Sequence, residues 1–441
     1  MTIPTSIQHS GAAPVAAPEG IRRNWVHVTA PKNKQWTTAM DGVDKLKLAE
    51  ADLPTPNDGE VLVKIHAVSI NYRDIEGKPQ GLAPLVSNHL ANTGTVCEGV
   101  FNHYNTQASE AVVPCSDMCG TVVDASKSKS ARFQNGARVM AIYLQSHLYG
   151  DVDEEDLASS LGLPLPGVLA QYRCFPAESL VAVPDYLSDA EASCLPLATT
   201  TAWTALNWMR PLASTNEVRD GGPSRRTVLL QGTTPVALAG LQIAKAAGLR
   251  AVMTGSTDDF TARAKAELGA DEAINYQTHW AWEGEVLKAT DDRGADVIFE
   301  TGGGARTLQK SFKCVAFGGL INCIGSLSGR TDDGEDGDGG GGGGDGGDGK
   351  TPKLHRLNVT ALALARNVTI KGVLNGGRDR LEEALAFYQE KGIKPVVDKT
   401  YAFGKAPEAL AYVKKGKHFG KVVVTVEDEP DDKDGEKKPK A

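Results

Sequence analysis

The sequence lacks the features that would place the protein in a membrane or on nucleic acid. None of its apolar runs approaches the ~20 residues that a helix needs to span a bilayer. Residues 1–24 hold no apolar core of the kind that signal peptides carry and few arginines, so we interpret them as a flexible lead-in. The formal net charge is -8, and no basic stripe marks a nucleic-acid surface. We therefore expect a cytoplasmic protein whose partner is a small-molecule substrate.

Cysteine is also scarce. The seven cysteines are odd in number and scattered, which argues against a disulfide framework and favours reduced, buried thiols in a reducing compartment. Two segments lack the apolar residues that a folded core requires. They are a Gly/Asp-rich insertion at residues 331–350 and a charged tail at residues 427–441. We predict that both are disordered and lie outside the fold.

What the sequence does contain is the pattern of two domains, as its length of 441 residues predicts. Residues 60–71 alternate, with Val61, Val63 and Ile65 on one side of an expected strand. Short strands and turns continue to about residue 184. From about residue 188 strands alternate with helices, and a helix from Arg378 carries apolar residues at helical spacing. The pattern predicts a β-rich domain followed by an α/β domain.

The segment from Val228 to Tyr276 reads as strand, tight turn, helix and second strand, the first half of a dinucleotide-binding unit. Only Gly232 remains of the expected G-x-G-x-x-G. The small side chains of Thr233 and Thr234 still let the backbone approach a pyrophosphate. The helix that starts at Pro235 and Val236 offers free N–H groups and a positive dipole end to the phosphates. The segment therefore predicts a nicotinamide dinucleotide cofactor.

The end of the second strand bears on which cofactor binds. A site for NAD usually places Asp or Glu about 20 residues after the glycine motif, where it holds the ribose 2′-hydroxyl. This chain has Gly255 and Ser256 there, which favours NADP(H), with Arg250 and Arg263 as candidate partners of the 2′-phosphate. The acidic pair at 258–259 argues the other way unless it caps the following helix.

Five sequence blocks occur in an order that resembles the medium-chain dehydrogenase/reductase superfamily. The most similar branch is the zinc-free, quinone-oxidoreductase-like and zinc-type alcohol dehydrogenase-like one. The blocks are residues 68–74, 113–120, 195–203, 268–276 and 418–423. The resemblance implies an α/β fold with a split GroES-like β domain plus a Rossmann-type doubly wound parallel sheet, and an active site in the cleft between them. It divides the chain into a catalytic domain (25–190), a cofactor domain (191–374) and a return to the catalytic domain (375–426).

The resemblance also bears on whether the chain has the ligands for a catalytic zinc ion. Zinc-dependent members carry a cysteine where this chain has Asn71, and a His-Glu pair where it has Ser116 and Asp117. Because zinc takes thiolate, imidazole or carboxylate ligands in a tetrahedral set, Asn71 and Ser116 cannot supply the site. We therefore expect no metal.

Without a Lewis acid, the chemistry suits quinones and carbonyl-activated alkenes, which accept hydride readily. The protein then has to orient the acceptor and donate hydrogen bonds to a developing oxyanion. We select Asn71, Tyr72 and Tyr143 as candidate catalytic residues because amide and phenol groups donate hydrogen bonds. The alternatives are that Asn71 is a turn residue that ends a strand and that Tyr72 is an aromatic packed at the domain seam.

Further cofactor contacts are implied by the resemblance alone. Thr201 matches the family threonine near the nicotinamide, and Tyr276 matches a tyrosine on the adenosine side. Gly325 and Leu327 match the loop that lines the nicotinamide pocket. Lys421 matches the family lysine near the cofactor, and Gly420 matches the residue before it.

Three functions remain open from the sequence. The first is an NADPH-dependent, zinc-independent reductase of an activated alkene, quinone or small carbonyl compound. The second is an alcohol or enoyl-thioester oxidoreductase. The third is a cofactor-binding protein that has no turnover and a structural or partner-binding role. By analogy with the family, residues 368–373 could extend the sheet across a homodimer.

Overall fold

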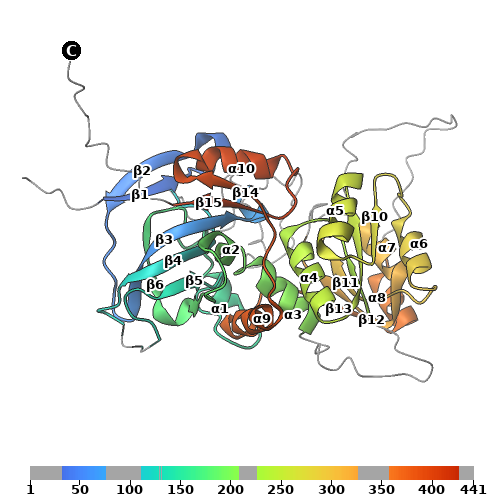
Figure 1. The fold of residues 1–441 in the computed structure, drawn as a ribbon. Coiled ribbons are helices and arrows are strands. Elements are labelled where there is room, and N and C mark those ends of the chain that lie inside the picture. Colours follow the sequence, from blue (N-terminus) through green and yellow to red (C-terminus); the bar gives the residue numbers. More distant parts are fainter. Residues whose placement is uncertain are drawn as a thin grey trace, which may run out of the picture.

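A computed structural model describes residues 32–75, 111–128, 130, 132–207, 226–325 and 357–426, which form two lobes (Figure 1). The predictions made for residues 1–24, 331–350 and 427–441, and for Leu327, lie outside these ranges. Within the described ranges, no helix is both long and apolar enough to cross a membrane.

The first lobe is a mostly antiparallel β structure. Its seven-stranded sheet has the order β14-β15-β3-β4-β5-β7, with β6 also paired to β3. The strands are β3 (Glu60–Ile70), β4 (Asp117–Asp124), β5 (Arg138–Ala141), β6 (Tyr172–Pro176), β7 (Leu180–Ala182), β14 (Val397–Ala402) and β15 (Lys421–Thr425). A separate hairpin joins β1 (Lys32–Thr37) to β2 (Lys47–Asp52). Because β15 pairs with β3, the end of the described chain is built into the lobe that its beginning forms.

Strand β3 confirms the predicted strand but is buried more fully than its alternation indicates. In its first half Val61, Val63 and Ile65 are buried as expected and Leu62 is buried as well, whereas Ala67 to Ile70 are buried on both faces. The reason is that this half lies centrally between β4 and β15 and is covered by α2 (Asp189–Ser193). The buried half leads directly to Asn71.

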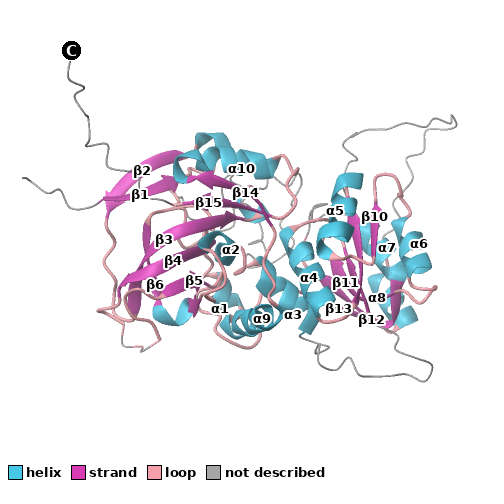
Figure 2. Cartoon of the chain, in the orientation of Figure 1, coloured by secondary structure: helices cyan, strands magenta, loops and turns pink. Residues whose placement is uncertain are grey.

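The second lobe is a doubly wound parallel sheet with helices on both faces (Figure 2). The strand order is β10-β9-β8-β11-β12-β13. The strands are β8 (Thr227–Leu230), β9 (Arg250–Gly255), β10 (Glu272–Asn275), β11 (Ala295–Glu300), β12 (Val315–Cys323) and β13 (Thr369–Gly372). The helices are α4 (Pro235–Ala246), α5 (Asp258–Leu268), α6 (Trp282–Ala289), α7 (Ala305–Cys314) and α8 (Val359–Arg366). The chain leaves β8 in one direction to β9 and later returns to its other side as β11. The carboxyl end of β8 is therefore the switch point where such folds bind ligands.

Helix α4 packs closely against the sheet, and Gly240 allows this. A Cβ at residue 240 would lie 2.7 Å from Cε2 of Phe299 and 2.8 Å from Cδ2 of Leu230. In the usual motif the third glycine permits this contact, but that position is Ala237 here. Gly240 therefore provides, about one turn later, the close packing that Ala237 cannot.

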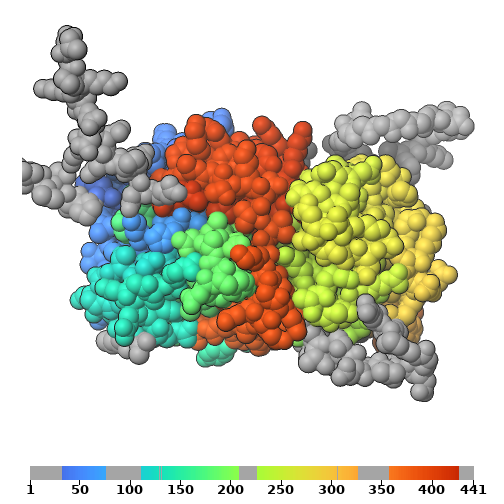
Figure 3. Space-filling view, viewed as in Figure 1, coloured from blue at the N-terminus to red at the C-terminus, as the bar shows by residue number. Residues whose placement is uncertain are grey.

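The segment that returns from the second lobe to the first lies along their junction, coloured orange-red in Figure 3. It begins with α9 (Arg378–Lys391), whose buried residues include Leu381, Ala384 and Tyr388, as the helical spacing predicts. Helix α9 packs against α3 (Ala198–Asn207), and α10 (Ala406–Lys414) follows. The observed architecture confirms the predicted fold class.

Candidate active site

A buried polar cluster lies where β3 ends. The ammonium of Lys421, at the start of β15, donates to Oδ1 of Asn71 at 2.6 Å, to Oδ2 of Asp117 at 3.2 Å and to the carbonyl of Ile70 at 3.4 Å. Lys421 and Asp117 are 3% and 0% exposed as side chains. The amide of Asn71 donates to the hydroxyl of Ser116 at 3.2 Å, and that hydroxyl donates to Asp117 at 2.9 Å. We call these four side chains the ammonium cluster.

The ammonium cluster is connected to the helix that carries Thr201. The carboxylate of Asp117 accepts from the backbone N–H of Leu197 at 3.3 Å, just before α3. One turn on, the hydroxyl of Thr201 donates to the Leu197 carbonyl at 2.8 Å and lies 3.2 Å from Oδ1 of Asn375. Asn375, in the loop after β13, was not predicted, because its partner is 174 residues away in the sequence. Thr201 thus lies one helical turn from the cluster, between the lobes.

Tyr72 and Tyr143 occupy different surroundings. Tyr72 follows Asn71 in a short 3₁₀ turn (Tyr72–Asp74) and is 47% exposed. Tyr143 is half-buried under Arg73, whose guanidinium carbon lies 4.8 Å from the ring centroid. Arg73 also donates to the carbonyl of Leu161 at 2.8 Å. Asn71 and Tyr72 are therefore adjacent in the fold, and Arg73 connects Tyr143 to the same turn.

The carboxylate of Asp74 fixes this turn from within. Its Oδ2 accepts from the backbone N–H of Asn71 at 2.8 Å. Asn71 directly follows β3, so the alternative that it is a turn residue at the end of a strand is confirmed. Burial raises the pKa of Asp74 to about 6, against the opposing effects of Arg73 and of the Asn71 hydrogen bond. The side chain of Asn71 still points into the ammonium cluster, so its place in the turn and its place in the site are compatible.

The predicted phosphate-binding turn sits at the carboxyl end of β8. Two hydroxyls hold it, one on β9 and one just after β11: Thr254 accepts from the N–H of Gly232 at 3.0 Å, and Thr301 donates to the Gln231 carbonyl at 3.0 Å. Thr234 caps α4 by accepting from the N–H of Ala237, and Pro235 starts the helix. Thr233, Thr234 and Val236 therefore surround a helix N-terminus whose dipole favours an anion.

The predicted adenosine side is assembled beside this turn. The N–H of Tyr276 donates to the carbonyl of Gly255 at 3.0 Å, which joins the carboxyl ends of β9 and β10. A Cβ on Gly255 would lie 3.7 Å from the Thr233 side chain, so the two turns are neighbours. Ser256 follows as a partly exposed residue. Asp258 accepts from the amide of Asn275 at 2.7 Å, which holds this carboxylate against β10.

The structure places one predicted partner of a 2′-phosphate far from the predicted site and gives the other contacts within the protein. Arg250 begins β9 and pairs with Thr227, so it lies at the amino edge, about 16 Å of strand from Gly255. Arg263 on α5 binds Glu267 at 2.8 Å, and its guanidinium carbon lies 4.2 Å from the ring centroid of Phe419. Glu267 lies one helical turn from Arg263, whereas Phe419 is distant in the sequence and no local pattern points to it.

The remaining predicted positions have clear structural roles. Gly325 follows β12, and its N–H lies 3.4 Å from the Glu300 carbonyl. Gly420 has φ of 116°, and a Cβ there would lie 2.5 Å from the carbonyl of Val396. Only glycine allows this approach, which directs Lys421 into the cluster. Glu300, at the end of β11, was missed although it is buried and accepts from Gln231 and Ser311.

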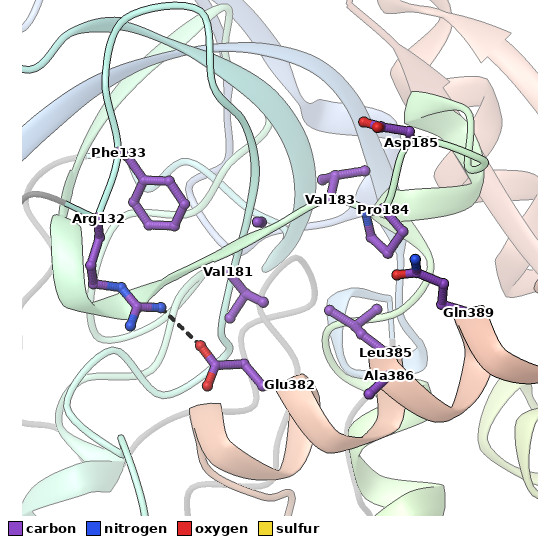
Figure 4. Close-up of a pocket in the computed structure, with 11 residues that line it drawn as sticks. Arg132, Phe133, Val181, Val183, Pro184, Asp185, Glu382, Leu385, Ala386 and Gln389 are labelled. Atoms are coloured by element: carbon purple, nitrogen blue, oxygen red, sulfur yellow. Dashed lines mark hydrogen bonds and ion pairs between the residues drawn. The ribbon is translucent and has the colours of Figure 1, made fainter.

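A surface groove of about 620 Å³ lies apart from these residues, between β7 and α9 (Figure 4). Arg132 and Glu382 form an ion pair at 2.8 Å at its edge, and Val181 and Leu385 contribute apolar lining. Its lining residues include no member of the ammonium cluster and no residue of the phosphate-binding turn.

The side chains at the expected metal position do not match a zinc donor set. They offer an amide, a hydroxyl and one carboxylate, and a lysine ammonium already donates to two of them. Within the ranges that the structure describes, no group of three His, Cys, Asp or Glu side chains is placed to hold a metal ion.

Comparisons with known proteins agree with this architecture. Residues 57–185 match the alcohol dehydrogenase GroES-like domain, and residues 268–424 match the zinc-binding dehydrogenase family. A zinc-type alcohol dehydrogenase-like protein of Schizosaccharomyces pombe is 31% identical, over 88% of this chain and 97% of that protein. A chloroplastic quinone-oxidoreductase of Triphysaria versicolor is 25% identical, over 87% of this chain and 94% of that one. A crystal structure of a candidate alcohol dehydrogenase from Sinorhizobium meliloti 1021 is 33% identical, with a TM-score of 0.67, over 90% of this chain and all of that one.

The GroES-like lobe and the Rossmann-type lobe, with a turn and a helix N-terminus at the switch point, define an oxidoreductase from a family that binds a nicotinamide cofactor. The chain belongs to the medium-chain dehydrogenase/reductase superfamily, among its zinc-type alcohol dehydrogenase-like members.

Proposed function

We propose that the protein is an NADPH-dependent, zinc-independent reductase of an activated alkene, a quinone or a small carbonyl compound. One observation carries the proposal: Asn71, Ser116 and Asp117, which the family resemblance aligns with zinc ligands, bond to one another, and Lys421 donates to Asn71 and Asp117. A site without a Lewis acid favours acceptors that take up hydride readily. The similarity to a quinone-oxidoreductase supports the same substrate class.

The preference for NADPH rests on the end of β9. Gly255 and Ser256 place no carboxylate where a NAD site usually has one, and Asp258 is held by Asn275. A 2′-phosphate would therefore meet less repulsion here than in a NAD site. Since Arg250 and Arg263 are committed elsewhere, the preference comes from missing repulsion rather than from a dedicated arginine.

The side chains near Asn71 can perform the protein's part of a hydride transfer. When bound, the cofactor supplies a hydride to the β-carbon of an enone or to a quinone, and a proton from solvent completes the reduction. Asn71 can donate a hydrogen bond to the developing oxyanion through its amide, and Tyr72 can donate one through its phenol. Tyr72 is accessible from solvent, whereas Asn71 is buried and fixed by its neighbours.

The test is to mix the purified protein with NADPH and either 9,10-phenanthrenequinone or an enone, with and without a strong chelator, and to measure zinc by elemental analysis. We expect NADPH oxidation that the chelator does not change and no stoichiometric zinc. One zinc per chain together with loss of activity on chelation would contradict the proposal. Turnover only with alcohols or enoyl thioesters would support the second function, and NADPH binding without turnover on any acceptor would support the third.

We also propose that the protein forms a homodimer through β13. In the described part of the chain β13 pairs only with β12, which leaves one edge of the sheet without a neighbouring strand. Ile370 on β13 is 36% exposed, and the nearby Leu374 is more exposed still. An exposed edge strand with apolar side chains is a template for pairing with another strand, and a second copy would supply one.

A further inference from the structure

We propose that Lys421 is a positioning residue that replaces the catalytic metal as the fixed positive charge of the site and acts through Asn71. This inference rests on the proposed function and names the residue that makes its hydrogen-bond donor effective. The three hydrogens of the Lys421 ammonium match three surrounding oxygens, those of Asn71, Asp117 and Ile70. These oxygens supply the polar environment that a nearly fully buried ammonium requires.

The lysine determines which end of the Asn71 amide serves as donor. An ammonium can donate hydrogen bonds but cannot accept them, so the amide oxygen must face Lys421. The amide nitrogen then points the other way, where one hydrogen bonds Ser116 at 3.2 Å. Among the described residues Ser116 is the one acceptor of this amide, and we assign its second hydrogen to a substrate oxygen. The positive charge beside the oxygen also polarises the amide, which strengthens its N–H as a donor.

The backbone holds the lysine in place independently of substrate. The N–H of Lys421 donates to the carbonyl of Val396 at 2.8 Å, in the close approach that Gly420 allows. Phe419, two residues earlier, is fully buried against Phe260, with a ring-centroid separation of 5.8 Å. The ammonium is therefore preorganised, as a metal would be, and needs no reorganisation during hydride transfer.

The experiment is a double-mutant cycle between Lys421→Met and Asn71→Ala, with stopped-flow measurement of the rate of NADPH oxidation by a quinone in a single turnover. The equilibrium dissociation constant of NADPH is measured in parallel by fluorescence titration. Lys399→Met, at an exposed lysine on the neighbouring strand β14, is the matched control.

We expect Lys421→Met to lower the single-turnover rate roughly 10- to 100-fold. This loss should not exceed the loss of rate caused by removing the hydrogen-bond donor itself. The dissociation constant of NADPH should stay within about threefold. In the Asn71→Ala background, Lys421→Met should lower the rate by less than about threefold, because a residue that acts through Asn71 has nothing left to position. Lys421→Arg, which keeps the charge, should recover part of the rate.

The role of Lys421 would be overturned if the two substitutions had additive effects on the rate. It would also be overturned if the fall in rate were matched by an equal weakening of NADPH binding. If Lys421→Met does not fold because Asp117 is left without a counter-charge, the cycle is run with Lys421→Met and Asp117→Asn combined and is judged by the same additivity. A wild-type protein that turns over no acceptor would overturn the proposed function and this inference together. An active wild type with an additive cycle would overturn this inference alone.

Discussion

The guanidinium of Arg263 lies over the ring of Phe419, with its central carbon 4.2 Å from the ring centroid, and the two residues belong to different lobes. Asp398 approaches the same guanidinium at 4.0 Å and also accepts from the N–H of Phe419 at 3.1 Å. The first helix after β9, at whose end we predict the adenosine side of the cofactor, is thereby attached to the segment that carries Lys421. Arg263 is thus a structural contact between the lobes.

This contact predicts the behaviour of Arg263→Met. Loss of the cation–π contact should lower the free energy of unfolding by about 1 kcal/mol, the range for a partly exposed pair. The ratio of the NADPH and NADH dissociation constants should change by less than about threefold. Urea unfolding and fluorescence titration measure the two effects, with Lys265→Met on the same helix as control. A selective tenfold loss of NADPH affinity would restore Arg263 as a phosphate partner.

Ser256 is the position at which cofactor preference should change. A carboxylate introduced by Ser256→Asp would face the 2′-phosphate and should weaken NADPH binding relative to NADH by about 1–3 kcal/mol. Ser256→Asn, which introduces the neutral isostere of aspartate, should leave the ratio of the NADPH and NADH dissociation constants almost unchanged. Dissociation constants for both cofactors in all three proteins provide the comparison. Equal constants in the wild type would show that the end of β9 does not select the cofactor.

The phenol of Tyr72 can be tested without disturbing its ring. If the hydroxyl contacts the developing oxyanion, Tyr72→Phe should lower kcat/KM on a good enone or quinone by about 10²–10³-fold while NADPH affinity stays constant. If the ring only packs at the seam, the loss should be less than about threefold. Tyr149→Phe, at an exposed tyrosine of the same lobe, is the control. The smaller loss would leave Asn71 and the backbone as the remaining donors.

Asp74 predicts a dependence of stability on pH. Its pKa is raised from 3.8 to about 6 in the folded protein, so between these values the folded state holds a proton that the unfolded chain has released. The free energy of unfolding should therefore fall as pH rises from about 4 to 6, by at most about 3 kcal/mol from this group. The Asp74→Asn variant should lack this part of the pH dependence of the free energy of unfolding. Urea unfolding at several pH values measures the difference, and parallel curves for the two proteins would refute it.

The homodimer is tested at the edge of the Rossmann-type sheet. Ile370→Arg places a charge on the exposed face of β13 and should shift the protein from dimer to monomer in light scattering at micromolar concentration. Leu48→Arg, at an exposed leucine of the other lobe, should leave the mass unchanged. A monomeric wild type, or a dimer that Ile370→Arg does not affect, would exclude β13 as the interface.

Local patterns predicted the elements, whereas the partners of the site residues came from the fold. The spacing of Leu381, Ala384 and Tyr388 was enough for α9, because helical periodicity is visible within a few turns. The contact between Lys421 and Asn71 joins residues 350 apart in the sequence, and no local pattern encodes it. The contact between Arg263 and Phe419 escapes local patterns for the same reason, since Phe419 lies far along the chain.

The threonines that hold the phosphate-binding turn alter how this chain tolerates mutation. Where a turn depends on three glycines, substitution of any one of them is expected to weaken cofactor binding. Here Gly232 is bonded to Thr254 on β9, and its neighbour Gln231 to Thr301, the residue after β11. Those two hydroxyls are therefore expected to matter beside Gly232, whose φ of 71° itself favours glycine. A search of variants for loss of cofactor binding should therefore recover changes at residues 254 and 301, which a scan confined to the glycine motif would overlook.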